Sequence, residues 1–408
     1  MRLRLMFALS ATLCQVIALP VPASARPAVV PVAQTPAFVD DPSGTPADAD
    51  ADDPAIWVHP SDPGAGVVLG TLKEGGLAAF DLDGALLRHL AAPKHGRFNN
   101  VDVLGDLAAV SDRGLDRVRF YRIDPRGAAA GDDVLREVTG AGAARVFPGA
   151  ALGEQRTAYG LAFGRDRSGA PVLAVSRRHE TEIALLRPRG KEGVTAEHIA
   201  TIALPSTFAL PDGTRWSPCG EPGERPQVEG MALDSANQVL FAAQEDVGIW
   251  RVPLRDNGFG KPELIDRVRG FGVPASYDPE TGECAPSGPD PGFGGRHLSA
   301  DAEGLALSGD GRLIASSQGD STFVVYERTG ANRVLGTFAV KAGNGNDSVE
   351  HCDGAAVTTA ALGPKFPNGL LVAHDGERRP RVNDPAGNPL PTTGFALIRW
   401  DDVRRALR

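Results

Sequence analysis

Two stretches of this chain carry the same order of residues that could do chemistry. In VEGMALDSANQVLFAAQED, residues 228–246, Glu229 and a glycine precede a short apolar run, a turn and a second apolar run that ends in a glutamine. AEGLALSGDGRLIASSQG, residues 302–319, repeats this order from Glu303 to Gln318. A separation of about fifteen residues fits a tight two-stranded hairpin, whose pairing brings both polar ends together. Carboxylate and amide oxygens gathered in this way are ligands that suit a hard metal ion.

Four further stretches follow the same plan more loosely, so the chain reads as a repeat. Their first apolar runs begin after Asp53, Asn100, Tyr159 and Asp353. Their second runs end near Lys73, Arg113, Arg178 and Asp375. A third run with an aromatic residue follows most of them, as in LAAFDLD, VRFYRID, GIWRV, FVVYER and FALIRW. About six units of three or four strands, roughly 45–75 residues apart, predict an all-β fold, a six-bladed β-propeller with antiparallel blades around a central channel.

Length and composition fit one such domain over residues 48–408. Apolar residues make up 42% of the 408 residues and can supply a core. The 49 glycines and 33 prolines suit a chain with many tight turns. The closing WDDVRRALR, residues 400–408, is the one segment for which we predict a helix.

The N-terminus has the pattern of a secretory signal. A basic start, an apolar stretch and the small residues Ala23-Ser24-Ala25 predict a signal peptide over residues 1–25, and the apolar stretch is too short for a membrane span. Residues 26–47, rich in Pro, Ala and Asp, are predicted to be a disordered leader. The mature protein is therefore expected to be secreted or periplasmic.

Three cysteines remain after removal of the signal peptide. Cys219 and Cys284 lie in Pro- and Gly-rich insertions, where a disulfide would add order, but the sequence leaves open whether they are paired. Cys352 is expected to be a free thiol, because it lacks the spaced partners of a zinc site.

The propeller prediction gathers the repeated polar residues at one end of the channel. First strands line the channel and second strands return to the same end, so the residues that open the former and close the latter form a ring. At any single position such a residue can be no more than a turn residue, but turn chemistry does not require glutamate before glycine twice at matching offsets. Several carboxylates in one ring repel one another unless cations are bound, and oxygen ligands favour calcium, with several ions expected.

Three cations occupy matching places in consecutive units. Lys73, Arg113 and Arg178 each close a second strand beside the acidic ring. An anion held between calcium and these cationic groups would explain both sets of charges.

Several runs resemble those of the β-propeller phytases, the calcium-dependent 3-phytases. The resemblance covers the chain from about residue 48 to the C-terminus and is carried by DDPAIWVHP (52–60), FNNVD (98–102), VEGMALD (228–234), QEDVGIW (244–250), DAEGLAL (301–307) and SSQGDSTFVVYER (316–328). It implies a six-bladed propeller that releases phosphate from phytate, myo-inositol hexakisphosphate, with calcium ions between enzyme and substrate. A small-molecule substrate, calcium phytate, is thus expected, with no nucleic-acid partner, no membrane attachment after signal removal, and a monomeric state.

The resemblance also implies roles for individual residues. The residues expected in catalysis and phosphate contact are Lys73, Arg113, Tyr159, Arg178 and Glu229. The residues expected to bind calcium or its water are Asp53, Asn100, Asp102, Glu229, Glu245, Asp301, Glu303, Gln318 and Asp353. At the position of Arg178 the family commonly carries lysine, and arginine keeps the charge while allowing bidentate contact with phosphate.

Two other function classes fit a propeller with this ring. A calcium-dependent lactonase would also place carboxylates around a channel metal, and a non-catalytic binding propeller would need no reactive centre. The cations discriminate between these classes, because a neutral lactone does not require Lys73, Arg113 and Arg178 beside the metal.

Overall fold

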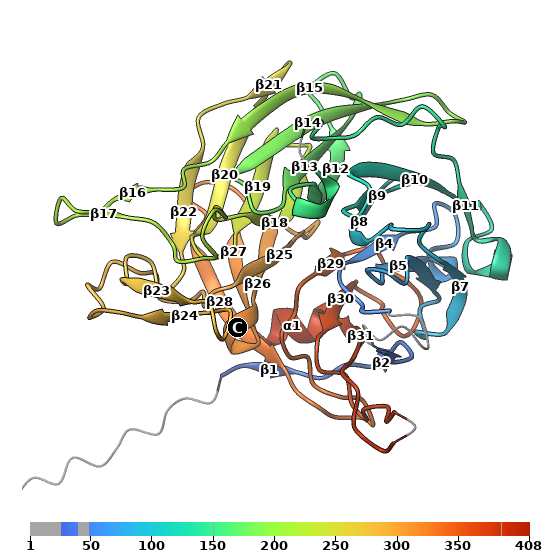
Figure 1. Ribbon diagram of the computed structural model, residues 1–408. Helices are drawn as coiled ribbons and strands as arrows, with labels where there is room; N and C mark the ends of the chain where they lie inside the picture. The colour runs from blue at the N-terminus through green and yellow to red at the C-terminus, as the bar shows by residue number, and fades with distance from the viewer. Residues whose placement is uncertain (1–25, 40–48, 150, 385) are drawn as a thin grey trace, which may run out of the picture.

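The repeats fold into six antiparallel blades around a central channel. The computed structural model describes residues 26–39, 49–149, 151–384 and 386–408, and its sheets follow one another around a ring (Figure 1). The predicted six-bladed β-propeller is therefore confirmed. The predicted signal peptide, residues 1–25, lies outside the described residues.

Each blade begins at the channel and ends at the rim. The first strands are β4 (Pro54–Trp57), β8 (Phe98–Leu104), β12 (Ala158–Arg165), β18 (Val228–Asp234), β25 (Ala302–Leu307) and β29 (Ala355–Thr358). The second strands are β5 (Val67–Thr71), β9 (Leu107–Asp112), β13 (Pro171–Arg177), β19 (Val239–Gln244), β26 (Arg312–Ser317) and β30 (Leu370–Asp375). The third strands are β6 (Leu77–Phe80), β10 (Arg117–Ile123), β14 (Glu182–Arg189), β20 (Gly248–Arg255), β27 (Thr322–Glu327) and β31 (Thr392–Arg399). The outer strands of the first five blades are β7 (Leu86–Leu90), β11 (Leu135–Glu137), β15 (Thr195–Ala203), β22 (Glu263–Arg267) and β28 (Val334–Val340), and β21 (Gly258–Phe259) also pairs with β20.

The first strands form a closed ring, since β29 of the last blade packs beside β4 of the first. Apolar side chains fill the space between neighbouring blades. Trp57 and Tyr121 belong to the cluster between the first two blades, and Phe80 and Phe395 to the one that joins the last blade to the first. Because each cluster draws on two or more blades, the packing of every blade depends on its neighbours in the ring.

The N-terminal segment closes the ring, which corrects one prediction. Residues 26–47 were expected to be a disordered leader, but β1 (Ala28–Val29) pairs with β28, and both β2 (Ala33–Gln34) and β3 (Phe38–Val39) pair with β31. Burial alternates along this segment, with Val29, Ala33 and Thr35 almost fully buried. The prediction is therefore wrong for residues 28–39. Their buried and exposed side chains alternate as in a strand, but the high content of Pro and Ala made the segment resemble a disordered leader. Residues 40–47 lie outside the described part of the chain.

Two hairpins extend from one side of the propeller. They are β16 (Phe208–Ala209) with β17 (Arg215–Trp216), and β23 (Ala275–Asp278) with β24 (Glu283–Pro286), which precede and follow the strands of the fourth blade in the sequence and project on the same side of it (Figure 1). A disulfide joins the two insertions through Cys219 and Cys284, which settles the pairing that the sequence left open.

An aromatic group anchors the first of these hairpins to the fourth blade. The rings of Trp216 and Phe271 lie 4.6 Å apart, and Phe208 packs against Trp250.

Cys352, as predicted, is a free thiol, and it is buried.

The predicted C-terminal helix is present as α1 (Trp400–Ala406), and Trp400 and Val403 bury its inner face. In the described residues, the structure has no helix with the length and apolar character needed to cross a bilayer.

Candidate active site at the mouth of the central channel

Bulges near the start of four first strands direct side chains into the channel mouth. In β8, β12, β18 and β25 the register shifts so that two residues oppose one on the second strand. The paired residues at these bulges are Asn99-Asn100, Tyr159-Gly160, Glu229-Gly230 and Glu303-Gly304. A bulge turns a side chain away from its regular direction, which explains why the same offset carries polar residues blade after blade.

The glycine in the second place of the bulges in β12, β18 and β25 allows the first strands to approach one another. A Cβ atom on Gly230 would lie 2.1 Å from the backbone oxygen of Glu303, and one on Gly160 would lie 1.9 Å from that of Glu229. Neither position can accept a side chain without moving the next blade. The glutamate-glycine pair therefore reflects both the site and the packing of the ring.

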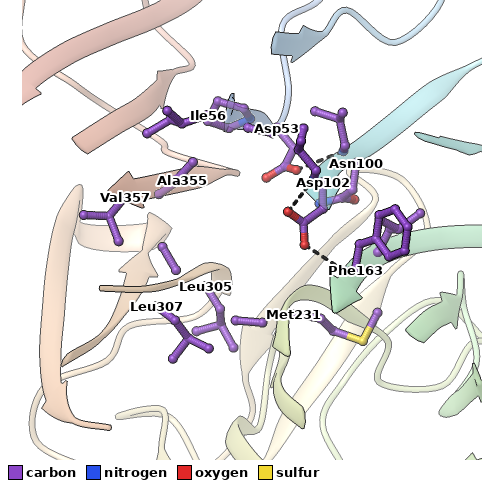
Figure 2. Close-up of a pocket in the computed structure, with 18 of the residues that line it drawn as sticks. Asp53, Ile56, Asn100, Asp102, Phe163, Met231, Leu305, Leu307, Ala355 and Val357 are labelled. Atoms are coloured by element: carbon purple, nitrogen blue, oxygen red, sulfur yellow. Dashed lines mark hydrogen bonds between the residues drawn. The ribbon is translucent and has the colours of Figure 1, made fainter. Parts of the chain in front are cut away.

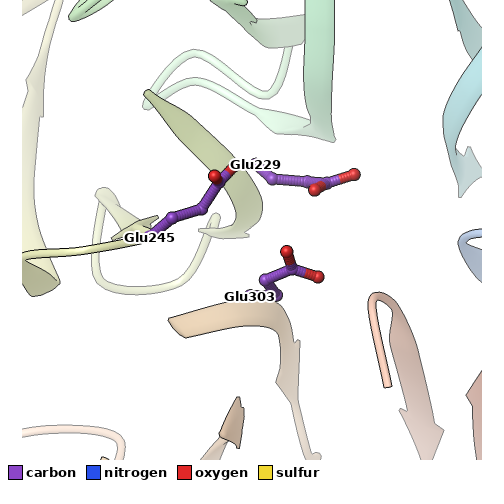
Figure 3. Close-up of side chains that lie close together, drawn as sticks. All are labelled: Glu229, Glu245 and Glu303. Atoms are coloured by element: carbon purple, nitrogen blue, oxygen red, sulfur yellow. The ribbon is translucent and has the colours of Figure 1, made fainter. Parts of the chain in front are cut away.

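Three glutamates from the fourth and fifth blades meet at the mouth. One carboxylate oxygen from each of Glu229, Glu245 and Glu303 lies within 4.8 Å of the others, and Figure 3 shows the side chains pointing toward a shared space. Their exposed fractions are only 4%, 9% and 5%. Burial, followed by repulsion from Asp353, raises the pKa of Glu229 to about 7. Burial and repulsion within the group raise the pKa of Glu245 and Glu303 as well.

A bound cation fits this group. The protein alone disfavours charge on three buried carboxylates this close together, whereas an ion with oxygen ligands would offset that repulsion. Gln318, from the 3-10 turn Gln318–Asp320 after β26, adds an amide group, and its Nε2 donates to Asp353 Oδ1 at 2.6 Å. Glu229, Glu245, Glu303, Gln318 and Asp353 therefore could hold calcium together.

Glu229 connects the acidic side of the mouth to a cationic side. Its two carboxylate oxygens accept hydrogen bonds from the Tyr159 hydroxyl at 2.7 Å and from Asn99 Nδ2 at 2.6 Å. Arg113 donates to Asn99 Oδ1 at 3.1 Å, and its guanidinium lies 5.6 Å from the centre of the Tyr159 ring. Asn99 alone therefore separates Arg113 from the carboxylate of Glu229, which the sequence predicted to act in catalysis.

Two arginines, Arg113 and Arg178, supply positive charge at the mouth. Burial and the neighbouring Arg97 and Arg178 lower the pKa of Arg113 to about 10, so it stays protonated at neutral pH. Arg178 follows β13 and donates to Gln155 Oε1 at 2.7 Å. Burial and the charges of Arg178 and Arg113 lower the pKa of the next residue, His179, to about 4. Arginines that are close enough to repel one another in this way are suited to share an anion.

Lys73 stands on the other flank of the mouth. Its ammonium pairs with Asp50 and lies 3.9 Å from an Asp353 oxygen. Burial opposes its charge, but Asp52, Asp50 and Asp353 together raise the pKa of Lys73. The structure therefore brings Lys73, Arg113 and Tyr159 beside the glutamate group and Arg178 close to Arg113. Their role in phosphate contact stays a prediction.

Three predicted metal ligands lie deeper, inside the channel. Asp53, Asn100 and Asp102 line a cavity of about 290 Å³, whose other walls are mostly apolar, as Figure 2 shows. Asp53 Oδ2 accepts the Val101 N–H at 3.1 Å, and Asp102 Oδ2 accepts the Phe163 N–H at 2.7 Å. Burial raises the pKa of Asp102 to about 6 and that of Asp53 well above its ordinary value. Asn100 Oδ1 also accepts a hydrogen bond from Asn99 Nδ2 at 3.0 Å, so this polar group inside the channel is connected to the mouth.

The remaining predicted residues, Asp301 and Asp375, have different partners. Asp301 shares a hydrogen bond with Asp246, beside Glu245, and burial raises the pKa of Asp246 to about 7. Asp375, buried at the end of β30, instead accepts the backbone N–H groups of Glu350 and Glu377.

Sequence reasoning missed three residues at the mouth. Asn99 bridges Arg113 and Glu229, Gln227 donates to Glu245, and Asp52 is buried, with one carboxylate oxygen that has no hydrogen-bond partner. Burial raises the pKa of Asp52 well above its ordinary value. Asp52 and Asn99 directly precede positions that were singled out, so the doubled letters of DDP and FNN were the available signal for them. Gln227 lies two residues before Glu229.

Comparison with known proteins agrees with the geometry. A family model described as Phytase matches residues 3–116 and 276–408. The 3-phytase of Bacillus subtilis (strain 168) is 29% identical over 373 residues, which cover 88% of this chain and 81% of that protein.

Solved structures similar to this chain come from several sources. A chain of a mitotic checkpoint complex is 14% identical with a TM-score of 0.47, covering 97% of this chain and 98% of that one. A luciferin-regenerating enzyme is 8% identical with a TM-score of 0.46, covering 86% and 94%. Because the family model matches more than half of its length, the chain belongs to the phytase family, in its β-propeller form.

Proposed function

We propose that the protein is a calcium-dependent phosphomonoester hydrolase that releases phosphate from phytate. One observation carries the proposal: buried glutamates that need a cation converge at the same mouth as Lys73, Arg113 and Arg178. A phosphate ester needs both sets of charges, since its oxygens can bind the metal on one side and guanidinium groups on the other.

Glu229, Glu245, Glu303, Gln318 and Asp353 are the proposed calcium ligands at the mouth, directly or through water. Asp53, Asn100 and Asp102 are proposed to hold a further ion or its water inside the channel, and Asp301 is proposed to support the mouth beside Glu245. Calcium bound there would offset the carboxylates, draw in the phosphate and make water a better nucleophile.

The chain's own residues would carry the other parts of the reaction. Arg113 and Arg178 would bind equatorial phosphate oxygens, and Lys73 would add a third positive charge. The Tyr159 hydroxyl, whose single proton goes to Glu229 in the structure, would donate to a phosphate oxygen instead once calcium engages that carboxylate. Glu229 would orient a water for in-line attack and accept its proton, while the P–O ester bond breaks and the departing alkoxide oxygen takes a proton from solvent water. No covalent enzyme intermediate is required.

We also propose that the protein is exported to the periplasm or the medium and acts as a monomer. The disulfide between Cys219 and Cys284 supports the first point, because such bonds persist in oxidising compartments. Cell fractionation and mass measurement in solution would test the two points separately.

Phosphate release from calcium phytate by the purified protein tests the proposed function. Release is expected with calcium and is expected to stop in excess chelator. A panel of lactones tested in parallel addresses the alternative chemistry, and lactone opening without phosphate release would refute the phosphatase assignment.

A further inference from the structure

Gln227 directly precedes β18 and contacts both sides of the mouth. Its Nε2 donates to the two carboxylate oxygens of Glu245, each at 2.9 Å. Its Oε1 accepts the backbone N–H of His179 at 2.8 Å. One side-chain amide therefore connects an acidic residue of the proposed calcium group to the turn that carries Arg178.

That turn depends on the loop that ends at Gln227. His179 has a left-handed backbone conformation, with φ at 56°, which is costly for a residue with a side chain. Three contacts from the loop hold it: Gln227 accepts its N–H, Arg225 N–H donates to its carbonyl at 3.1 Å, and Glu224 Oε1 lies 2.9 Å from its Nδ1. The backbone directly after Arg178 is thus held by the same loop, whereas the guanidinium of Arg178 is held by Gln155.

The same amide restrains a carboxylate that its neighbours repel. Glu245 lies among Glu229, Asp301 and Asp246, whose charges oppose its own. Two N–H···O bonds from one amide hold both of its oxygens without adding a charge. Without them we expect the carboxylate to rotate away from Glu229 and Glu303.

We propose that Gln227 is a positioning residue that fixes Glu245 and the turn bearing Arg178 in a single arrangement, and so couples calcium affinity to phosphate affinity. The inference rests on the proposed function for the identity of the two ligands. Gln227 touches neither ligand in this account; it acts through Glu245 and through the backbone of His179. Groups that orient a metal ligand from behind typically alter metal affinity or activity by about 10- to 100-fold.

The conservative variant Gln227→Asn tests this, because it keeps the amide but is one methylene too short to reach both partners. Gln238→Asn is the matched control: Gln238 lies in the turn at the opposite end of β18 and β19 and donates to the backbone carbonyls of Arg165 and Ser235. Calcium binding is measured by calorimetry without substrate, and phosphate binding by inhibition with inorganic phosphate. Melting temperature in excess chelator reports on the fold alone.

For Gln227→Asn we expect calcium to bind about tenfold more weakly and inorganic phosphate to inhibit several-fold more weakly, with the melting temperature in chelator unchanged. Gln238→Asn is expected to match the parent in calcium affinity, phosphate inhibition and melting temperature. Arg178→Ala is expected to weaken phosphate inhibition alone. Parental calcium affinity in Gln227→Asn, or weaker calcium binding with unchanged phosphate inhibition, would overturn the inference. If Gln227→Asn weakens the binding of both calcium and phosphate but the parent frees no phosphate from phytate, the proposed function is refuted and this inference stands.

Discussion

Glu229 accepts hydrogen bonds from Tyr159 and Asn99 while it lies within reach of Glu245 and Glu303. Glu229→Gln keeps the shape of the side chain but removes a charge that the cation and the attacking water need. We expect turnover of phytate to fall by about 100-fold and the calcium requirement to rise. Steady-state rates over a calcium series measure both effects.

The exposed Glu197→Gln, in outer strand β15, is the control for the loss of one negative charge, and it should behave as the parent does. Parental turnover in Glu229→Gln at limiting calcium would contradict the assigned role.

At this scale the sequence located segments better than individual side chains. It singled out Asp53 and Asn100, which face the channel interior, whereas their neighbours Asp52 and Asn99 contribute at the mouth. For Asn99 and Asn100 the reason is physical: a regular strand alternates its side chains, but the bulge in β8 sets two residues against one and changes which of them faces the ring. Asp52 and Asp53 precede the regular strand β4, and two adjacent aspartates do not show which of them faces the mouth. Where glycine occupies the second place, as after Glu229 and Glu303, the choice is unambiguous and the prediction found the group.

The N-terminal strands β1 and β2 complete the fifth and sixth blades with residues from the other end of the chain. A chain lacking residues 1–39 should therefore lose stability relative to one lacking residues 1–25. The lost burial of Val29 and Ala33 should by itself lower the free energy of unfolding by about 3 kcal/mol. The uncovered edges of β28 and β31 should promote aggregation. Denaturant unfolding of the two chains measures the difference. Equal free energies of unfolding would show that the closure does not contribute.

The elements that repeat were predictable and those that occur once were not. Alternation of apolar residues and regular spacing identified the strands of the six blades. The closing strands of the N-terminus carry only short alternating segments interrupted by proline, and their partners lie more than three hundred residues away. The two hairpins beside the fourth blade are joined by the disulfide between Cys219 and Cys284. No local sequence pattern could show that these two cysteines pair.

The whole ring holds several buried carboxylates, which predicts how the metal-free protein responds to pH. Burial raises the pKa of Glu229 from 4.5 to about 7, that of Asp102 to about 6 and that of Asp246 to about 7. A carboxyl with a raised pKa binds its proton more tightly in the folded state, so its stabilising effect is complete below the unfolded pKa and disappears as pH rises through the folded pKa. Glu229 alone corresponds to about 3 kcal/mol.

In excess chelator, the melting temperature is therefore expected to fall between about pH 5 and about pH 8. Calcium should remove most of this fall, because the ion binds the folded state only and adds roughly 3–4 kcal/mol at several hundred to a thousand times its Kd. Thermal melts across this range, with and without calcium, give the comparison. A melting temperature that rises with pH in chelator would contradict the account.

The net charge of −9 would repel a polyanionic substrate if the molecule acted through its overall field. The mouth resolves this difficulty locally, because calcium would reverse the sign of the acidic side and Lys73, Arg113 and Arg178 would supply the other. Calcium is therefore expected to bind before phytate, so the KM for phytate should fall as calcium is raised toward saturation.

Guanidinium groups beside buried glutamates are what separate phosphate chemistry from lactone chemistry in this propeller, so Arg113 and Arg178 give the most direct test. The measurement is the initial rate of phosphate release from calcium phytate for the parent, Arg113→Ala, Arg178→Ala and Arg178→Lys. We expect rapid calcium-dependent release by the parent, a fall in turnover of about 100-fold in each alanine variant, and partial recovery in Arg178→Lys. Phytate hydrolysis at the parental rate by both alanine variants, or a parent that opens lactones but frees no phosphate, would contradict the account.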